Sequence, residues 1–217
     1  MIDFHTHTFN SDGELVPAEQ ARRAEMQGLE AVGITDHADA SNVEEAVEKA
    51  TRGKETASIP VLAGVEVTHV PPAKIASVVE RARDAGADVV IAHGETPVEP
   101  VKEGTNRAAI EAEVDVLGHP GLIEPRDVEL ARKNDVFLEI TSRRGHCLAN
   151  GHVAKLATEK GADLIVNTDS HHPDDFIDEE TAREVARGAG LSEDEVEEAV
   201  VENPHCLLER ATDEEVS

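Results

Sequence analysis

One pattern, repeated three times, restricts the fold of this chain more than any other feature of its sequence. Each copy contains the end of a helix, a glycine, a buried apolar strand and then a polar residue of a type that binds metal ions. The copies cover residues 24–37, 82–93 and 157–169. Near-continuous apolar strands that alternate with helices are typical of a parallel sheet covered on both faces. The pattern therefore predicts an α/β fold with parallel strands.

Helix and strand signals continue this alternation along the whole chain. We predict strands at residues 2–7, 31–35, 59–67, 88–92, 116–117, 136–141 and 164–168. Predicted helices cover residues 17–27, 42–52, 74–84, 106–113, 124–133, 151–160, 178–189 and 193–202. No linker or low-complexity segment divides the 217 residues, a length that suits one barrel of ~200–250 residues. We therefore expect residues 1–217 to form a single domain, a closed or nearly closed barrel of seven strands.

The first predicted strand already contains part of a metal site. Residues 2–7 alternate between apolar and polar types, so His5 and His7 should project from one face, with Asp3 below them. Two imidazoles on one rigid strand make half of a metal site. The turn sequence at 10–13 could fold Asp12 back over the strand end.

Six of the seven predicted strands end in residues that commonly bind metals. Because the carboxyl ends of parallel barrel strands meet at one mouth, these side chains should converge there. Polar groups crowded together without a partner would cost stability, so their convergence predicts a metal centre. Mixed imidazole and carboxylate ligands suit Mn, Fe or Zn better than Mg. The predicted ligands are His5, His7, Asp12, His37, Glu66, His93, His119, Asp169 and His171.

The order of the short motifs that carry these residues resembles the polymerase and histidinol phosphatase (PHP) superfamily. The motifs are His-Thr-His at 5–7, Ser-Asp-Gly at 11–13, Ile-Thr-Asp-His at 34–37, Gly-Val-Glu at 64–66, Ala-His-Gly at 92–94, Gly-His-Pro at 118–120 and Thr-Asp-Ser-His at 168–171. This ordered set covers essentially the whole chain and is far more specific than any one motif. The resemblance implies a distorted seven-stranded (β/α) barrel with up to three divalent metal ions.

The resemblance also implies how the ligands are divided among the ions. Some members of the superfamily place a histidine where Asp12 stands, which leaves the identity of the third metal open. The implied sets are His5, His7, Glu66 and Asp169 for the first ion, Glu66, His93 and His119 for the second, and Asp12, His37 and His171 for the third.

The expected chemistry is hydrolysis of a phosphoester. A close pair of divalent ions lowers the pKa of a shared water and clamps the oxygens of an in-line phosphoryl displacement. We predict a metal-dependent phosphoesterase that acts on a small phosphomonoester, with histidinol phosphate as one candidate, by a metal-activated hydroxide. A nuclease or a cyclic-nucleotide phosphodiesterase would use the same cluster. A rival of another class is a non-catalytic RNA-binding subunit, because the archaeal ribonuclease P protein with this fold resembles a barrel whose metal ligands have been lost. In this chain all nine ligand positions are filled.

Several residues near the predicted mouth are candidates for substrate binding. Glu139, Thr141 and Arg143 share one face of the sixth strand, so Arg143 should reach the mouth as that strand ends. Its planar guanidinium suits a phosphate, and Arg144 takes this role if the strand ends early. His69 and His146 are candidate substrate contacts or proton donors on loops at the same mouth.

Two acidic residues are candidates for orienting the imidazoles through their second nitrogen. These are Asp3 and Asp36, and for Asp36 a helix-capping role fits the sequence equally well.

The charge balance is strongly acidic. Forty-six acidic residues oppose twenty basic ones, a formal net charge of −26, and Arg outnumbers Lys by 13 to 7. Trp and Tyr are absent and Phe occurs four times. An acidic surface with few rings for base stacking argues against a nucleic-acid partner. An acidic, Lys-poor surface favours a protein of a high-salt cytoplasm, with an ordinary acidic cytosolic protein as the alternative.

The remaining signals concern the compartment. No apolar run approaches the ~18 residues of a membrane span, and nothing resembles a signal peptide. The two cysteines, Cys147 and Cys206, fit no metal or redox spacing and are expected to be reduced thiols. We therefore expect a cytoplasmic protein without a membrane partner.

Overall fold

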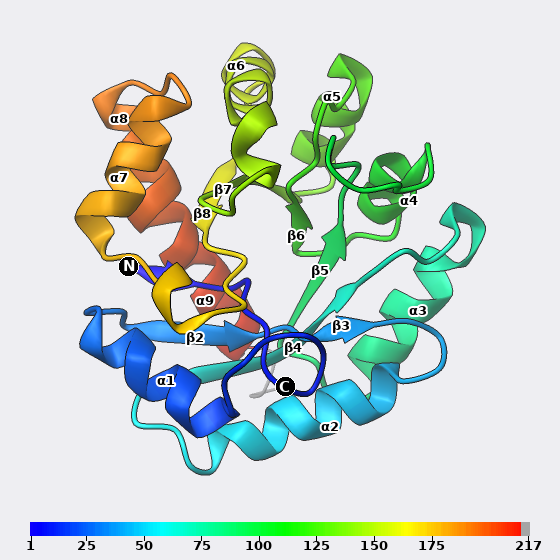
Figure 1. The fold of residues 1–217 in the computed structure, drawn as a ribbon. Coiled ribbons are helices and arrows are strands. Elements are labelled where there is room, and N and C mark those ends of the chain that lie inside the picture. Colours follow the sequence, from blue (N-terminus) through cyan, green and yellow to red (C-terminus); the bar gives the residue numbers. More distant parts are fainter. Residues whose placement is uncertain (214–217) are drawn as a thin grey trace.

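The strands of the protein run parallel and curl into a nearly closed barrel (Figure 1). The computed structural model describes residues 1–213. Strands pair in the order β1-β2-β4-β5-β6-β7-β8, and β3 continues the line of β2 because both pair with β4. The seven strand positions confirm the predicted fold class. The strands are β1 (Ile2–Asp3), β2 (Ala31–Ile34), β3 (His37–Ala38), β4 (Val61–Val67), β5 (Val89–His93), β6 (Val116–Gly118), β7 (Phe137–Thr141) and β8 (Leu164–Asn167).

The barrel is irregular at the seam between its first and last strands. An isolated bridge between Thr6 and Ser170 joins the two sides. The predicted strand 2–7 is regular only over Ile2–Asp3, because the backbone beyond it bonds to side chains as well as to strands. The Phe4 N–H, for example, donates to Oδ1 of Asn167 at 2.9 Å.

Helices surround the barrel in chain order, and the last one crosses behind the strands in Figure 1. Proline occupies the first turn of α1, α3 and α5, where its missing N–H has no helical partner to lose. A capping box of Ser192 and Glu195 opens α8. The helices are α1 (Pro17–Met26), α2 (Val43–Lys54), α3 (Pro72–Asp84), α4 (Thr105–Glu111), α5 (Pro125–Lys133), α6 (Asn150–Lys160), α7 (Glu179–Gly188), α8 (Glu193–Glu197) and α9 (Asn203–Asp213).

The end of the chain differs from the prediction of two closing helices. After α8 a π-helical turn over Glu198–Glu202 leads directly into a further helix, α9. Pro204 does not stop it, because the residue stands in the first turn of α9. Leu207 and Ala211 of α9 pack against apolar side chains of the strands and close the end of the barrel opposite the strand carboxyl ends.

The interior of the barrel consists of two layers. The lower layer is a separate apolar cluster, to which each strand position contributes. Above it, Gly118 leaves room for larger polar side chains, since a Cβ there would lie 3.0 Å from Oε2 of Glu139 and 3.1 Å from Cε1 of His5. The barrel thus combines an apolar base with a polar upper layer. The apolar cluster contains Ile2, Phe4, Ala31, Leu62, Val89, Ile91, Val116, Phe137, Ile165, Leu207 and Ala211.

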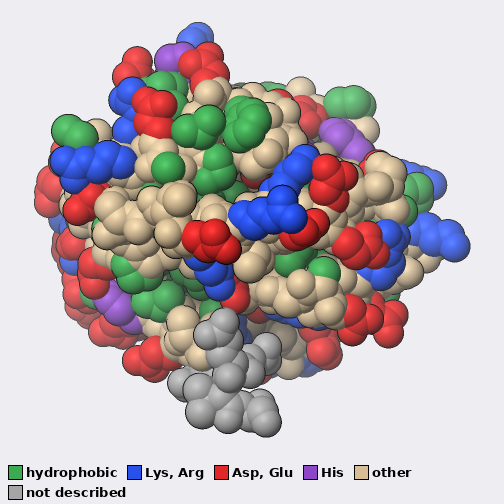
Figure 2. Space-filling model, turned by 90° about the horizontal axis from the view of Figure 1, so that it is seen from below, with side chains coloured by type: hydrophobic (Ala, Val, Ile, Leu, Met, Phe, Trp, Pro, Cys, Tyr) green, Lys and Arg blue, Asp and Glu red, His purple; other side chains and the backbone are tan. Residues whose placement is uncertain are grey.

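The outer surface carries charges of both signs. On the face shown in Figure 2, basic side chains lie beside acidic ones. Exposed pairs such as Arg81 with Glu44, 2.7 Å apart, contribute little stability each because water screens them. Cys147 and Cys206 are free thiols. Within residues 1–213, no helix has the length and apolar character needed to cross a membrane.

Candidate metal centre

All nine predicted ligands lie together at the mouth of the barrel, at or just beyond the carboxyl ends of the strands. Their ligand atoms form overlapping groups in which every atom lies within 4.8 Å of the others. Four groups consist of predicted ligands alone: His5, His7 and Glu66; His5, His119 and Asp169; Glu66, His93 and His119; and His7, Asp12, His37 and His171. A fifth group joins His93 to His69 and Glu99.

Two of these residues are held in a strained backbone conformation. His119 follows β6 with φ 28°, and Asp169 follows β8 with φ 53°. The left-handed region costs a non-glycine residue on the order of 1–2 kcal/mol. Such strain is concentrated at functional sites, where the surrounding structure enforces it. Here it accompanies the abrupt change of direction that keeps both side chains at the mouth.

A buried glutamate orients the first histidine. Oε2 of Glu139 lies 2.9 Å from Nδ1 of His5 and accepts a hydrogen bond from the N–H of His119 at 3.2 Å. The contact favours a proton on Nδ1, so Nε2 is the nitrogen that would bind a cation. Burial disfavours the charged form of His5, yet the carboxylates of Glu139, Glu66 and Asp169 raise its pKa well above its usual range, so a cation at Nε2 replaces a proton. That nitrogen faces Oε1 of Glu66 at 3.2 Å and Oδ1 of Asp169 at 3.7 Å.

Several buried nitrogen and oxygen atoms at the mouth are placed as the ligands of a metal ion would be. Nε2 of His5, Nε2 of His7 and Oε1 of Glu66 have no hydrogen-bond partner among the described residues. A divalent ion with bonds of about 2.1 Å holds neighbouring ligand atoms about 3.0–3.4 Å apart. The separation is 3.2 Å from His5 to Glu66, and Oε1 of Glu66 lies 3.4 Å from Nε2 of His119. The residues present therefore fit divalent metal ions.

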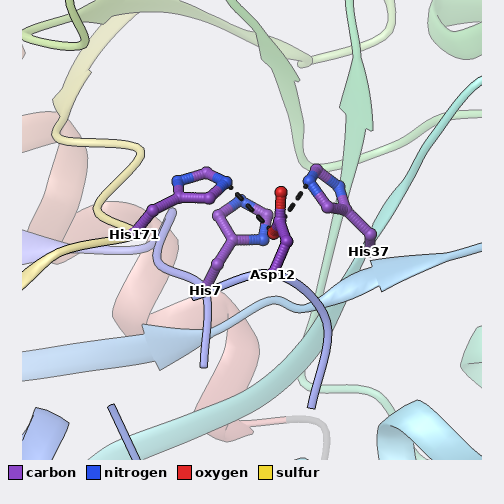
Figure 3. A group of neighbouring side chains, drawn as sticks. All are labelled: His7, Asp12, His37 and His171. Carbon is purple, nitrogen blue, oxygen red and sulfur yellow. Dashed lines mark ion pairs between the residues drawn. The ribbon is translucent and has the colours of Figure 1, made fainter. Parts of the chain in front are cut away.

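The outermost group is arranged around one aspartate (Figure 3). Oδ1 of Asp12 lies 3.4 Å from Nε2 of His37 and 3.2 Å from Nε2 of His171, so the carboxylate stands between the two rings. The ring of His7 lies 4.2 Å from each of the other two rings. The turn at residues 10–13 does fold Asp12 over the mouth, and His7 is within reach of this group as well as of the inner one.

Electrostatic interactions at the mouth are strong. Burial favours the neutral form of Glu66, but the imidazoles of His5, His93 and His37 hold its pKa well below the ordinary value. Burial disfavours the charged form of His37, yet the carboxylates of Glu66 and Asp12 raise its pKa to about 10. The pKa of His7 is lowered to about 4, mainly by burial. Metal binding at neutral pH must therefore displace a proton from His37 but none from His7.

The orienting carboxylate was not among the candidates, and the two proposed for that role do not fill it. Asp3 accepts hydrogen bonds from the hydroxyl and N–H of Thr168, and Asp36 accepts from Thr8 and Ser11. Neither contacts an imidazole, so that prediction was wrong for both. Asp36 does not cap α2 either, since that helix begins at Val43. The sequence could have indicated Glu139 through its spacing on β7. It follows Phe137 by two residues, and Phe137 points into the barrel.

The four residues predicted to bind substrate line different cavities at the mouth. Arg143 and His146 line a cavity of about 80 Å³ together with metal-ligand residues. Arg144 is exposed and lines only the adjoining hollow of about 490 Å³. His69 lines a second hollow of similar size on the other side of Asp12. Glu99, which the sequence did not single out, also lines the central cavity.

A parallel barrel whose mouth is lined by histidines and carboxylates defines a (β/α)-barrel class with a candidate multinuclear metal centre. The sequence profile of the PHP domain matches residues 3–186. The chain therefore belongs to the PHP domain family, which confirms the resemblance.

Individual relatives agree with this membership. An uncharacterized protein of Methanocaldococcus jannaschii is 50% identical over 96% of this chain and 99% of its own length. A probable phosphatase of a Thermoanaerobacter species is 30% identical over 89% of this chain and 88% of its own length. Among solved structures, a chain in archaeal ribonuclease P with mature tRNA has a TM-score of 0.73 at 16% identity, over 97% of this chain and 91% of that one. At that identity the similarity concerns the fold alone.

Proposed function

We propose that the protein is a metal-dependent phosphoesterase that hydrolyses a small phosphomonoester, with histidinol phosphate as one candidate substrate. Family membership and the relative named a probable phosphatase support the general class. The observation that carries the narrower proposal is the position of Arg143, which lines one small cavity together with ligand residues of all three proposed ions.

The proposed ligand sets are those implied by the family resemblance. His5, His7, Glu66 and Asp169 would hold a first ion, Glu66, His93 and His119 a second, and Asp12, His37 and His171 a third. The second set is also a group of neighbouring ligand atoms in the structure, whereas Asp169 lies with His5 and His119, and His7 lies with the third set as well as with His5 and Glu66. Bound Mn, Fe or Zn would lower the pKa of water and stabilise charge on the phosphoryl oxygens.

Charge balance explains why phosphate would need these ions. The nine ligands include three carboxylates, Asp12, Glu66 and Asp169, which contribute a charge of −3. Three divalent ions would contribute +6, so the loaded centre would be positive and would attract a phosphate dianion. Without ions the same carboxylates would repel it. Phosphate binding should therefore depend strictly on metal loading.

Arg143 is held where it can contact a phosphate. Its Nη1 lies 3.0 Å from Oδ2 of Asp175, and the same oxygen accepts hydrogen bonds from the N–H groups of His171 and His172. The aspartate thereby fixes the guanidinium beside a ligand residue. Because Arg144 lines only the outer hollow, we assign the phosphate contact to Arg143.

The surroundings of His146 favour a role in contacting the substrate over a role as proton donor. Burial, together with the nearby imidazole of His119, lowers the pKa of His146 to about 4. The ring is then neutral at pH 7 and offers a hydrogen bond rather than an extra proton. His69 is the more exposed of the two candidate histidines.

The alternative activities are less well supported. A nuclease or cyclic phosphodiesterase could use the same ligands, and an RNA-binding subunit could use the same fold. A polyanionic strand, however, must approach a chain with a net charge of −26 that contains no Trp or Tyr. The complete set of ligands at the mouth also argues against a role that needs no metal.

A substrate panel tests the proposal. Protein loaded with Mn should be assayed on p-nitrophenyl phosphate, histidinol phosphate, a bis-ester and single-stranded DNA. We expect a monoester to be cleaved fastest. Faster cleavage of DNA or of the bis-ester than of every monoester would contradict the phosphatase assignment.

A variant tests the role of Arg143. Arg143→Ala should raise KM for the monoester, with a loss on the order of 2–3 kcal/mol in kcat/KM for a charge-assisted contact. The matched control is Arg126→Ala, because Arg126 is 69% exposed and pairs with Glu124 on the outer surface. An equal effect of both variants would show that Arg143 acts only through general charge.

A further inference from the structure

A glutamate on the loop between β5 and α4 is directed at the metal centre although it belongs to none of the proposed ligand sets. Oε2 of Glu99 lies 3.1 Å from Nε2 of His93 and 3.4 Å from Nε2 of His69. Its other oxygen lies 3.4 Å from Nε2 of His146. The ring of His69 stacks on the ring of His93 with a centroid distance of 5.2 Å. One carboxylate thus faces three imidazoles at the rim of the mouth.

The contact between Glu99 and His93 is difficult to explain once His93 binds a metal. Nδ1 of His93 lies 3.1 Å from the carbonyl oxygen of Gly94, which keeps the proton on Nδ1 and leaves Nε2 as the ligand atom. A carboxylate oxygen 3.1 Å from Nε2 is attracted when that nitrogen carries a proton, as it can in the metal-free protein. Once Nε2 binds a metal the proton is gone, and the contact then requires a cation that both atoms share. Both separations around Oε2 of Glu99 match those of neighbouring ligands of one divalent ion, about 3.0–3.4 Å.

The backbone at His69 provides an independent observation. His69 has φ 53°, in the left-handed region that a non-glycine residue rarely adopts. Of the four other described non-glycine residues with positive φ, His119 and Asp169 are proposed ligands, whereas Glu113 and Asp135 follow the ends of α4 and α5. Strain of this kind is retained where a side chain must be placed for function. His69 therefore shares a backbone feature with the inner ligands.

We propose that His69, His93 and Glu99 form an outer seat for a divalent transition-metal ion. Because Nε2 of His93 can bind one ion at a time, this outer seat and the inner seat of Glu66, His93 and His119 are alternative positions for the second ion. The inner seat is buried, whereas the side chains of His69 and Glu99 are 44% and 37% exposed. An incoming ion first exchanges water for protein ligands at the outer seat and then moves inward. The inference rests on metal binding by the inner centre but not on phosphatase activity.

Uptake kinetics test the outer seat. Metal-free protein should be mixed with Co²⁺ in a stopped-flow spectrometer, and the ions bound at equilibrium should be counted by elemental analysis. Glu99→Gln and His69→Gln should each slow uptake of the second ion at least tenfold and leave the final count unchanged. The matched control is Glu103→Gln, an exposed carboxylate of the same loop, which should behave like the unaltered protein.

A double substitution tests the alternative positions directly. His119→Ala removes the inner seat. The variant should therefore retain its second ion at the outer seat, and its Co²⁺ spectrum should differ from that of the unaltered protein. His119→Ala combined with Glu99→Gln should bind one ion fewer than His119→Ala alone. Equal counts in these two variants would overturn the proposal. The proposal would also be overturned if Glu99→Gln took up the second ion as fast as the Glu103→Gln control. A lower final number of bound ions in Glu99→Gln would overturn it as well, because Glu99 would then be a permanent ligand.

These outcomes are distinguishable from failure of the proposed function. If the unaltered protein binds no ions, both the outer seat and the phosphoesterase proposal are wrong. If it binds ions and shows the expected kinetics but cleaves no phosphomonoester, only the proposed function is wrong.

Discussion

On strand β5, Ile91 and His93 are two residues apart and both point into the barrel, but they belong to regions with opposite physical character. Ile91 lies in the lower layer, where apolar side chains from all strand positions meet Leu207 and Ala211 of α9. His93 lies in the upper layer, among buried imidazoles and carboxylates. The lower layer stabilises the fold by removing apolar area from water. The upper layer costs stability unless a partner satisfies its polar atoms.

This difference separates the residues that maintain the barrel from those that make it reactive. Removing an apolar side chain from the lower layer leaves a cavity, whereas removing a ligand from the upper layer leaves the packing below it intact. Substitutions in the two layers should therefore affect different measurements. The following changes are ordered from the largest expected effect to the smallest.

Glu66→Gln should have the largest effect on activity. Glu66 belongs to two of the ligand groups, so the change weakens two positions at once. We expect at least one metal equivalent to be lost by elemental analysis. Turnover should fall on the order of 10³-fold or more, since a bound ion provides several kcal/mol of charge stabilisation. Full metal content with normal turnover would contradict the assignment of this layer.

Ile91→Ala should have the opposite profile. Ile91 is fully buried in the lower layer, and truncation of such a side chain costs about 2–5 kcal/mol of unfolding free energy. Denaturant unfolding of the metal-loaded protein should show the loss, while the number of bound ions stays the same. Loss of ions in proportion to stability would show that the two layers are not separate.

Glu139→Gln examines the boundary between the layers. The carboxylate contacts Nδ1 of His5 without belonging to any ligand group. Loss of such an orienting partner typically weakens metal affinity about 10–100-fold. Titration with Zn²⁺ against a competing chelator measures this change. An unchanged affinity would mean that packing alone orients His5.

Metal affinity at the outermost group should increase with pH. Because the pKa of His37 is raised to about 10 in the folded protein, its proton stabilises the metal-free fold fully below pH 6.5, and this contribution is lost as pH rises through about 10. An entering ion must displace that proton, so affinity should rise about tenfold per pH unit between pH 6.5 and 10. Calorimetry in buffers of different ionisation enthalpy should detect proton release on metal binding, and His37→Ala should release fewer protons than the unaltered protein. A pH-independent affinity would contradict the shift at His37.

Salt should act on the surface and leave both layers unchanged. If the net charge of −26 is a halophilic adaptation, as we propose, raising KCl from 0.1 to 1 M shortens the Debye length from ~10 to ~3 Å and relieves self-repulsion. The melting temperature should rise and the metal content should stay constant. A flat or falling melting temperature would leave the protein merely acidic.

Much of the fold was determined by local features of the sequence. Apolar strands alternating with helices, and glycines at helix ends, were sufficient to predict seven strand positions and a barrel. The nine ligand residues could be named because a parallel barrel places all strand carboxyl ends at one mouth. Period-2 alternation likewise put His5 and His7 on one side before any tertiary contact was considered.

Other features depended on contacts between distant segments. The helix α9 was missed because its apolar side chains match the barrel base, a surface that exists only once the strands have closed. Asp3 and Asp36 look like partners for imidazoles but bond to Thr168 and Thr8, whereas Glu139 reaches His5 from 134 residues away. Glu99 approaches His93 because a loop folds back over the mouth. Residue type and local period determine which side chains can bind a metal, but the partner of each carboxylate is decided by three-dimensional proximity.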